Sequence, residues 1–175
     1  MTAPIVHTLP AVEARAIAMA YSFAAGRSAL PGGVLNGITV HVGDLPGCYR
    51  ISFVPDDDPT KTSVVRMAKP GDAGSAGCPD GTAPETVLSG PEAEGVAKVM
   101  RAWSTDALPG APGVDLLASD GYQVQVNTVP ADSTTLAPGT IAVGLRPAAV
   151  AQGSCPPDYD YDPSNGSIAK LPPTC

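Results

Sequence analysis

Glycine and proline interrupt this chain so often that it can form only short helices and strands joined by many turns. The 175 residues include 19 glycines and 20 prolines, whereas the hydrophobic fraction of 43% is ordinary for a folded protein. The length is typical of one domain that buries a real hydrophobic core. We therefore expect a folded, loop-rich protein whose regular elements lie between these interruptions.

Two segments have the pattern of helices. The first runs from Pro10 to about Ser28, is rich in alanine and has proline at a first-turn position. In the second, "SGPE" predicts a capping box between Ser89 and Glu92. One stripe of the first helix contains Val12, Ala16, Met19 and Phe23, and one face of the second contains Val96, Val99, Met100 and Trp103. We expect the second helix to rest on a sheet.

Alternating apolar and polar residues predict strands in much of the remaining chain up to residue 150. The segments with this pattern are residues 37–44, 48–55, 63–67, 122–127 and 140–147. The order of helix, strands, helix and strands predicts an α+β fold with a mainly antiparallel sheet. We expect residues 1–150 to form a single domain, and no repeat of fixed period is visible in its sequence.

Residues 151–175 form a proline-rich segment in which Cys155 and Cys175 enclose a loop. Proline lacks an amide hydrogen and has a fixed φ, so it interrupts helices and inner strands. Five prolines lie between these two cysteines. The sequence therefore predicts an irregular surface loop at this end of the chain.

Three aspartates near the start of this segment alternate along the chain, namely Asp158, Asp160 and Asp162. Oxygen ligands at every second position, followed by a turn that contains glycine, suit a hard cation such as Ca²⁺. However, Ala169 occupies the place where a twelve-residue calcium loop ends on an acidic residue. Two interpretations stay open, an exposed acidic turn and a calcium site, and calcium is the one cofactor that the sequence suggests.

The four cysteines are Cys48, Cys78, Cys155 and Cys175, and none of them is part of a C-x-x-C motif. This spacing favours two disulfides over a zinc or redox site. We favour the sequential pairing, in which each bond closes a moderate loop and is worth roughly 3 kcal/mol. Disulfides persist in oxidising compartments, which predicts an extracellular or cell-surface location, although four reduced thiols stay an alternative.

Residues 2–10, "TAPIVHTLP", lack the pattern of a secretory leader. Two explanations stay open: a leader was removed before Met1, or the protein reaches an oxidising setting by another route, as virion proteins do after lysis.

Charge and motifs narrow the classes of function. The net charge of −7 and the absence of a basic run in the sequence argue against nucleic acid and anionic membrane surfaces as partners. No nucleophile elbow, phosphate loop or zinc-binding H-E-x-x-H motif is present in the sequence, and His7 and His41 are its two histidines. We therefore expect a non-enzymatic protein without a transmembrane segment in this chain.

The order of an N-terminal helix, an antiparallel sheet and a C-terminal segment enclosed by Cys155 and Cys175 resembles the globular domain of bacterial type IV pilins and pseudopilins. This resemblance implies a structural subunit of an extracellular filament. The alternatives are a virion structural protein, such as a capsid decoration, head-to-tail or tail component, and a secreted ligand-binding protein or enzyme. We expect the chain to associate with itself or with other subunits through Val12, Met19 and Phe23.

Overall fold

The computed structural model describes residues 6–26, 37–69, 84–105, 122–134, 138–147 and 158–171. The elements of the first half are β1 (Val6–Pro10), α1 (Ala11–Gly26), β2 (Ile38–Leu45), β3 (Cys48–Pro55), a 3-10 helix η1 (Pro59–Lys61) and β4 (Ser63–Ala68). Those of the second half are β5 (Glu85–Ser89), α2 (Gly90–Thr105), β6 (Tyr122–Thr128), β7 (Ile141–Pro147), β8 (Tyr159–Asp162) and β9 (Ser167–Lys170).

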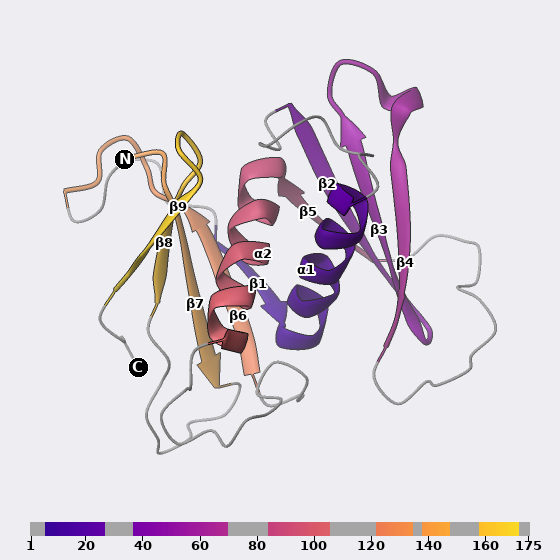
Figure 1. Ribbon diagram of the computed structural model, residues 1–175, viewed down its shortest axis with the longest axis horizontal. Helices are drawn as coiled ribbons and strands as arrows, with labels where there is room; N and C mark the ends of the chain where they lie inside the picture. The colour runs from indigo at the N-terminus through magenta and orange to yellow at the C-terminus, as the bar shows by residue number, and fades with distance from the viewer. Residues whose placement is uncertain are drawn as a thin grey trace.

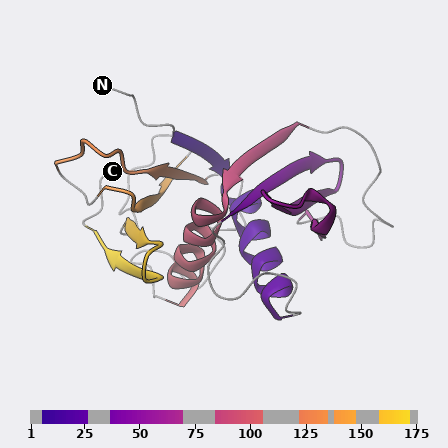
Figure 2. The ribbon, with the colours of Figure 1, turned by 90° about the horizontal axis from the view of Figure 1, so that it is seen from above.

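The strands form two antiparallel sheets. One has the order β1-β6-β7-β8-β9 and the other β4-β3-β2-β5. The two helices lie side by side between them, with α2 next to the five-stranded sheet and α1 next to the four-stranded one (Figures 1 and 2). The predicted α+β fold with mainly antiparallel strands is confirmed, although the strands form two sheets where one was expected.

The two halves repeat one design of strand, helix and antiparallel strands. β1 and β5 begin 79 residues apart, at Val6 and Glu85, and α1 and α2 also begin 79 residues apart, at Ala11 and Gly90. Both strands have five residues, both helices have 16, and in each strand only the fourth residue is buried. The structure thus reveals an internal repeat that the sequence analysis did not detect.

Each half gives its first strand to the sheet of the other half. β1 pairs with β6 of the second half, where Leu9 lies opposite Val124. β5 pairs with β2 of the first half, where Leu88 lies opposite Val40. Each sheet therefore contains strands from both halves of the chain.

The core lies where the helices meet the inner faces of the sheets. Its largest fully buried side chains include Trp103, Tyr161 and Phe53. Close packing of α2 on the sheet depends on Gly95, because a Cβ there would lie 3.1 Å from Cδ1 of Tyr161. Larger side chains at this position would push α2 away from the strands beneath it.

The C-terminal segment departs from its predicted form. Residues 159–162 and 167–170 are the strands β8 and β9, and β8 pairs with β7, so the expectation of an irregular loop is wrong for these residues. Tyr159 and Tyr161 are buried against the core, which explains why this part of the segment is ordered into a strand. Pro163 lies in the turn between β8 and β9, where a missing amide hydrogen breaks no sheet hydrogen bond.

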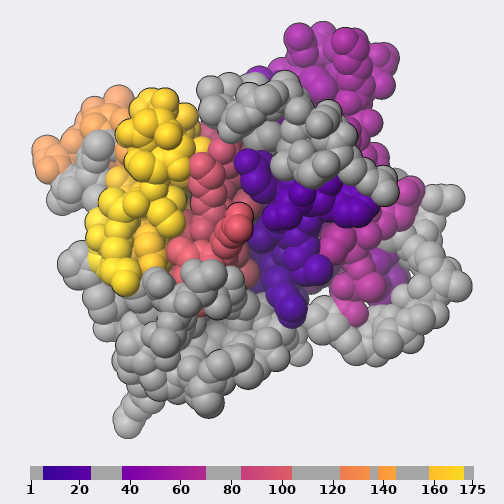
Figure 3. Space-filling view, viewed as in Figure 1, coloured from indigo at the N-terminus to yellow at the C-terminus, as the bar shows by residue number. Residues whose placement is uncertain are grey.

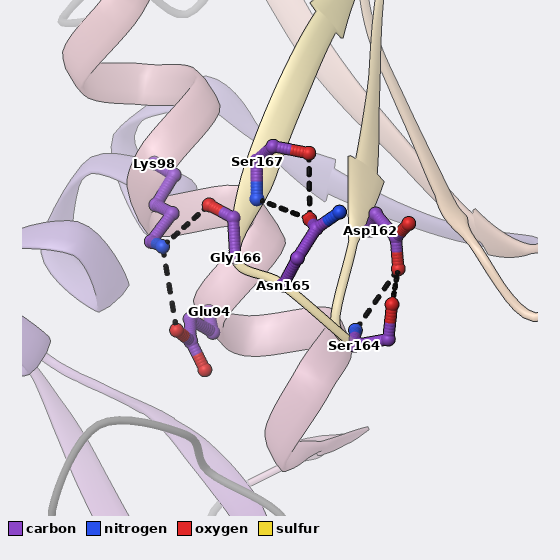
Figure 4. Close-up of polar contacts among 7 residues, drawn as sticks. All are labelled: Glu94, Lys98, Asp162, Ser164, Asn165, Gly166 and Ser167. Atoms are coloured by element: carbon purple, nitrogen blue, oxygen red, sulfur yellow. Dashed lines mark hydrogen bonds and ion pairs between the residues drawn. The ribbon is translucent and has the colours of Figure 1, made fainter.

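Lys98 of α2 anchors this hairpin to the helix (Figure 4). Its ammonium donates a 2.8 Å hydrogen bond to the Gly166 carbonyl oxygen and lies 3.7 Å from a carboxylate oxygen of Glu94. Gly166 has a φ of +75°, and a Cβ there would lie 2.9 Å from the Lys98 nitrogen. The hairpin turn therefore favours glycine for its backbone conformation, and a Cβ would also make the flexible end of the Lys98 side chain move.

Candidate interaction surface

Of the three predicted interface residues on α1, two are exposed to solvent and the third, Val12, packs partly against the core. Met19 and Phe23 are each 48% exposed, whereas Val12 is half-buried. Ala16, which belongs to the same sequence stripe, is buried beneath them. Two large apolar side chains one helical turn apart, both half open to solvent, form an apolar patch that the fold itself does not bury.

This patch forms one wall of a groove between the two helices, which we call the helix groove. Figure 3 shows surfaces of α1 and α2 reaching the front of the molecule between the strands on either side. The groove has a volume of about 690 Å³, and it is lined by Arg15, Ala18, Met19, Ser22, Phe23, Ala97, Met100 and Arg101. Apolar side chains line most of it, and an arginine from each helix adds positive charge.

A smaller pocket adjoins the groove on the other side of Met19. It has a volume of about 200 Å³, lies between α1 and β4, and is lined in part by Val12 and Met67. Arg15 and Met19 line both hollows. Met19 thus lies between the pocket that Val12 lines and the groove that Phe23 lines, and the role of the three residues as an interface stays a prediction.

The charge of this surface is opposite to that of the chain. The protein has a net charge of −7, yet the described residues lining the groove include Arg15 and Arg101 and no carboxylate. Both arginines are exposed. The surface thus suits a partner with an apolar portion and a negative charge.

Sequence analysis did not identify these two arginines. Arg15 lies one turn before Met19, so a helical projection of α1 would have placed it beside the apolar stripe. Arg101 belongs to a different helix, and the sequence contains no signal that the two helices pack side by side.

Glu94 and Lys98 form a partly buried ionic cluster on α2, next to Tyr21 and Tyr161. The Glu94 side chain is almost fully buried, and the Lys98 ammonium also lies 5.3 Å from the centre of the Tyr161 ring. Burial and the nearby Glu94 carboxylate raise the pKa of Tyr161, and the same two causes raise the pKa of Tyr21. Both phenols therefore stay protonated, which makes neither of them a ready base.

The repeat places two glutamates at equivalent positions in the first turns of the helices, Glu13 in α1 and Glu92 in α2. Each contacts the second residue of the strand that comes from the other half. Glu92 lies 3.4 Å from His7 of β1, and a hydrogen bond joins Glu13 to Thr86 of β5. These contacts join the first turn of each helix to the strand that comes from the other half.

Glu13 lacks a second partner for one carboxylate oxygen, and burial raises the pKa of this carboxyl above its ordinary value of 4.5. The folded state therefore binds a proton at a higher pH than the unfolded chain does, and stability falls as the pH rises from about 4.5 through the folded-state pKa. We expect Glu13→Gln to raise the free energy of unfolding at pH 7 but to have little effect near pH 4. Urea denaturation at both pH values measures this difference.

The exposed carboxylate of Asp132 offers a control, because Asp132→Asn should change stability by less than about 0.5 kcal/mol at either pH. An equal effect of Glu13→Gln at pH 4 and pH 7 would contradict the assignment of this cost to the buried charge.

Two of the three aspartates of the predicted calcium site, Asp160 and Asp162, have pKa values that their surroundings shift in opposite directions. Asp162 accepts hydrogen bonds from the Ser164 amide at 2.9 Å and its hydroxyl at 2.6 Å, which lower the pKa of Asp162 (Figure 4). Burial raises the pKa of Asp160. Within the described residues, no group of three or more His, Cys, Asp or Glu side chains is arranged to hold a metal ion. A calcium site at Asp158, Asp160 and Asp162 therefore stays a prediction.

The remaining predicted residues are placed as follows. Cys48 begins β3, is buried, and is not a free thiol. Cys78, Cys155 and Cys175 lie outside the described residues, so the disulfide pairing stays a prediction. His41 is partly exposed and lies 3.3 Å from Glu85.

Among the helices that the structure describes, neither is long and apolar enough to span a membrane.

Comparisons with protein-family models, with curated proteins and with solved structures found no match to this chain.

Proposed function

We propose that the chain is a non-enzymatic structural subunit that assembles with copies of itself or with other subunits, and that the helix groove is its contact surface. The observation that carries this proposal is the pair Met19 and Phe23, each 48% exposed beside an apolar groove. Burying a whole side chain of this kind is worth about 1.5–3 kcal/mol, so completing the burial of both adds about 2–3 kcal/mol to association.

The setting that we propose is extracellular, either a filament of the pilin-like type or a virion. The four cysteines support an oxidising environment, and the buried Cys48 is not a free thiol. A strand precedes α1 and the chain contains an internal repeat, so a subunit of this kind would present a rigid body rather than a free helix to its neighbours.

A second candidate is a secreted ligand-binding protein. The groove volume of about 690 Å³ lies in the range of small-molecule sites, and the two arginines would suit an amphipathic anion. A groove shared by two exposed helices is an open surface, however, and open surfaces suit protein partners better than small ligands. We therefore keep assembly as the main proposal.

The double substitution Met19→Ser and Phe23→Ser tests the proposal. We expect self-association to weaken by about 2–3 kcal/mol, or roughly a hundredfold, because the apolar contact is lost. Sedimentation velocity over a range of concentrations measures the effect, and thermal unfolding checks that the fold is intact. A matched control is Val64→Ser with Val87→Ser, since these valines are 44% and 43% exposed and lie on β4 and β5. An equal loss in both double variants would count against the groove.

A further inference from the structure

We propose that the helix groove receives the acidic turn of a second copy of this chain, residues 56–58 between β3 and β4. This inference rests on the proposed function and adds the identity of the partner surface. The groove needs a partner with negative charge and some apolar surface. The turn has the sequence "PDDDP", in which a proline on each side of three aspartates supplies the apolar portion.

The position of the turn would allow it to insert into a groove on another molecule. β3 and β4 form a hairpin whose tip projects from the body of the molecule, as Figures 1 and 3 show. Asp56 and Asp57 are exposed, and so is Pro59. A projecting tip can reach into a groove on another molecule without a clash between the two bodies.

The turn is also held in one conformation before it binds. A carboxylate oxygen of Asp56 accepts a 2.7 Å hydrogen bond from the Thr39 hydroxyl, and the Asp56 amide donates a 2.8 Å bond to the Gly37 carbonyl. Asp58 accepts a 3.2 Å bond from the Thr60 amide and caps η1. Because its two neighbours are fixed in this way, Asp57 is presented to solvent at low entropic cost.

The charges of the two surfaces are complementary. Arg15 provides a guanidinium group in the groove, and Asp57 together with the second carboxylate oxygen of Asp56 provides acceptors for it. Two grooves that faced each other would bring like charges together, which disfavours a symmetric contact through this surface. The contact between a tip and a groove is heterologous, so it can continue from copy to copy into a ring or an open filament.

Charge reversal tests the pairing. We expect Arg15→Glu and Asp57→Lys each to weaken self-association at least about tenfold, because each variant faces like charge with like charge. The chain that carries both changes should recover to within about threefold of the wild-type constant, since the pair is restored with its signs exchanged. Ser22→Glu, at an exposed position in the groove lining, is a second groove variant, should Arg15→Glu lower the yield of folded protein.

Mixing the two single variants gives a sharper result. The Arg15→Glu chain keeps its aspartate tip, which can enter the wild-type groove of the Asp57→Lys chain. The Asp57→Lys chain has a lysine tip, which can pair with the glutamate in the groove of the Arg15→Glu chain. We therefore expect each variant alone to associate at least about tenfold more weakly than the wild type, and an equimolar mixture to co-assemble at a ratio of 1:1 in sedimentation experiments. Matched controls are Arg66→Glu and Asp132→Lys, which reverse exposed charges outside both surfaces and should leave association unchanged.

The outcomes separate the two proposals. Wild-type association that Asp57→Lys leaves intact, while Met19→Ser with Phe23→Ser abolishes it, would overturn the acidic turn as partner and keep the groove. A wild-type protein that is monomeric at every concentration would overturn both. Loss in each single variant together with recovery in the mixture supports the head-to-tail contact.

Discussion

Replacing Trp103 by alanine should lower the free energy of unfolding by about 3–5 kcal/mol, the largest loss that we expect from one core substitution. Trp103 is 1% exposed near the end of α2, and its ring meets Tyr159 edge to face, with centroids 6.3 Å apart and an interplanar angle of 69°. The substitution removes this contact and leaves a cavity between α2 and β8. Urea denaturation monitored by circular dichroism measures the loss.

Trp103→Phe provides the matched control, because it keeps an aromatic ring against Tyr159 and removes less volume. We expect it to cost about half as much as the alanine variant. A loss below about 1 kcal/mol for Trp103→Ala would mean that the helix does not pack on β8 as the structure shows.

The second large effect concerns Lys98. Substitution by methionine keeps the length of the side chain but removes the ammonium that lies beside the buried Glu94 and bonds the Gly166 carbonyl. A buried carboxylate without its cation is strongly destabilising, and because the lysine side chain is 35% exposed we expect a loss near the lower end of the range, about 3 kcal/mol.

A double-mutant cycle shows whether this loss comes from the charge. The chain with both Glu94→Gln and Lys98→Met should recover most of the stability lost in Lys98→Met, because the neutral amide leaves no buried charge. If the double variant is as unstable as the single one, the effect belongs to the hydrogen bond with Gly166 and to packing. Chemical denaturation of all four proteins completes the cycle.

The helices and inner strands could be predicted because their signals are local. The capping box of α2 is present, with a 3.2 Å bond from the Glu92 amide to the Ser89 hydroxyl and a 2.9 Å bond from the Ser89 amide to the Glu92 carboxylate. Strands β2 and β3 pair antiparallel, with their buried residues at the alternating positions that the sequence shows. Here local pattern and tertiary environment agree.

Strands β1 and β5 were missed because each buries one residue only, Leu9 in one and Leu88 in the other. A single buried side chain produces no alternation, and the partner strands come from the other half of the chain. β8 and β9 were missed because neighbouring prolines dominate their sequence. β1, β5 and β8 each pair with a strand outside their own local segment, which a local pattern does not encode, and β9 completes a hairpin with β8.

The internal repeat is almost invisible in the sequence. Over residues 6–26 and their equivalents 79 positions later, identical residues occur at four positions: Leu9 and Leu88, Glu13 and Glu92, Ala14 and Ala93, and Ala18 and Ala97. The leucines are the buried residues of β1 and β5, and each glutamate contacts the strand that comes from the other half. The alanines are small residues of the helices. The equivalence becomes visible through the shared geometry.

The candidate surface was half predictable for a similar reason. The stripe of Val12, Met19 and Phe23 follows from helical spacing, and the structure places these residues along the groove and its adjoining pocket. The arginines belong to two helices, and their meeting depends on how α1 and α2 pack together. The positive charge of the groove could therefore be recognised only from the fold.

The measurement that tests this account most directly is sedimentation velocity of the wild-type chain, oxidised and untagged, from low micromolar to near millimolar concentration. Assembly through the helix groove predicts that the weight-average mass rises continuously with concentration beyond that of a dimer and falls again when salt is added, because charge pairs contribute to the contact. A mass that stays at that of one chain over the whole range, in low and in high salt, would contradict the proposal that this protein is a self-assembling subunit.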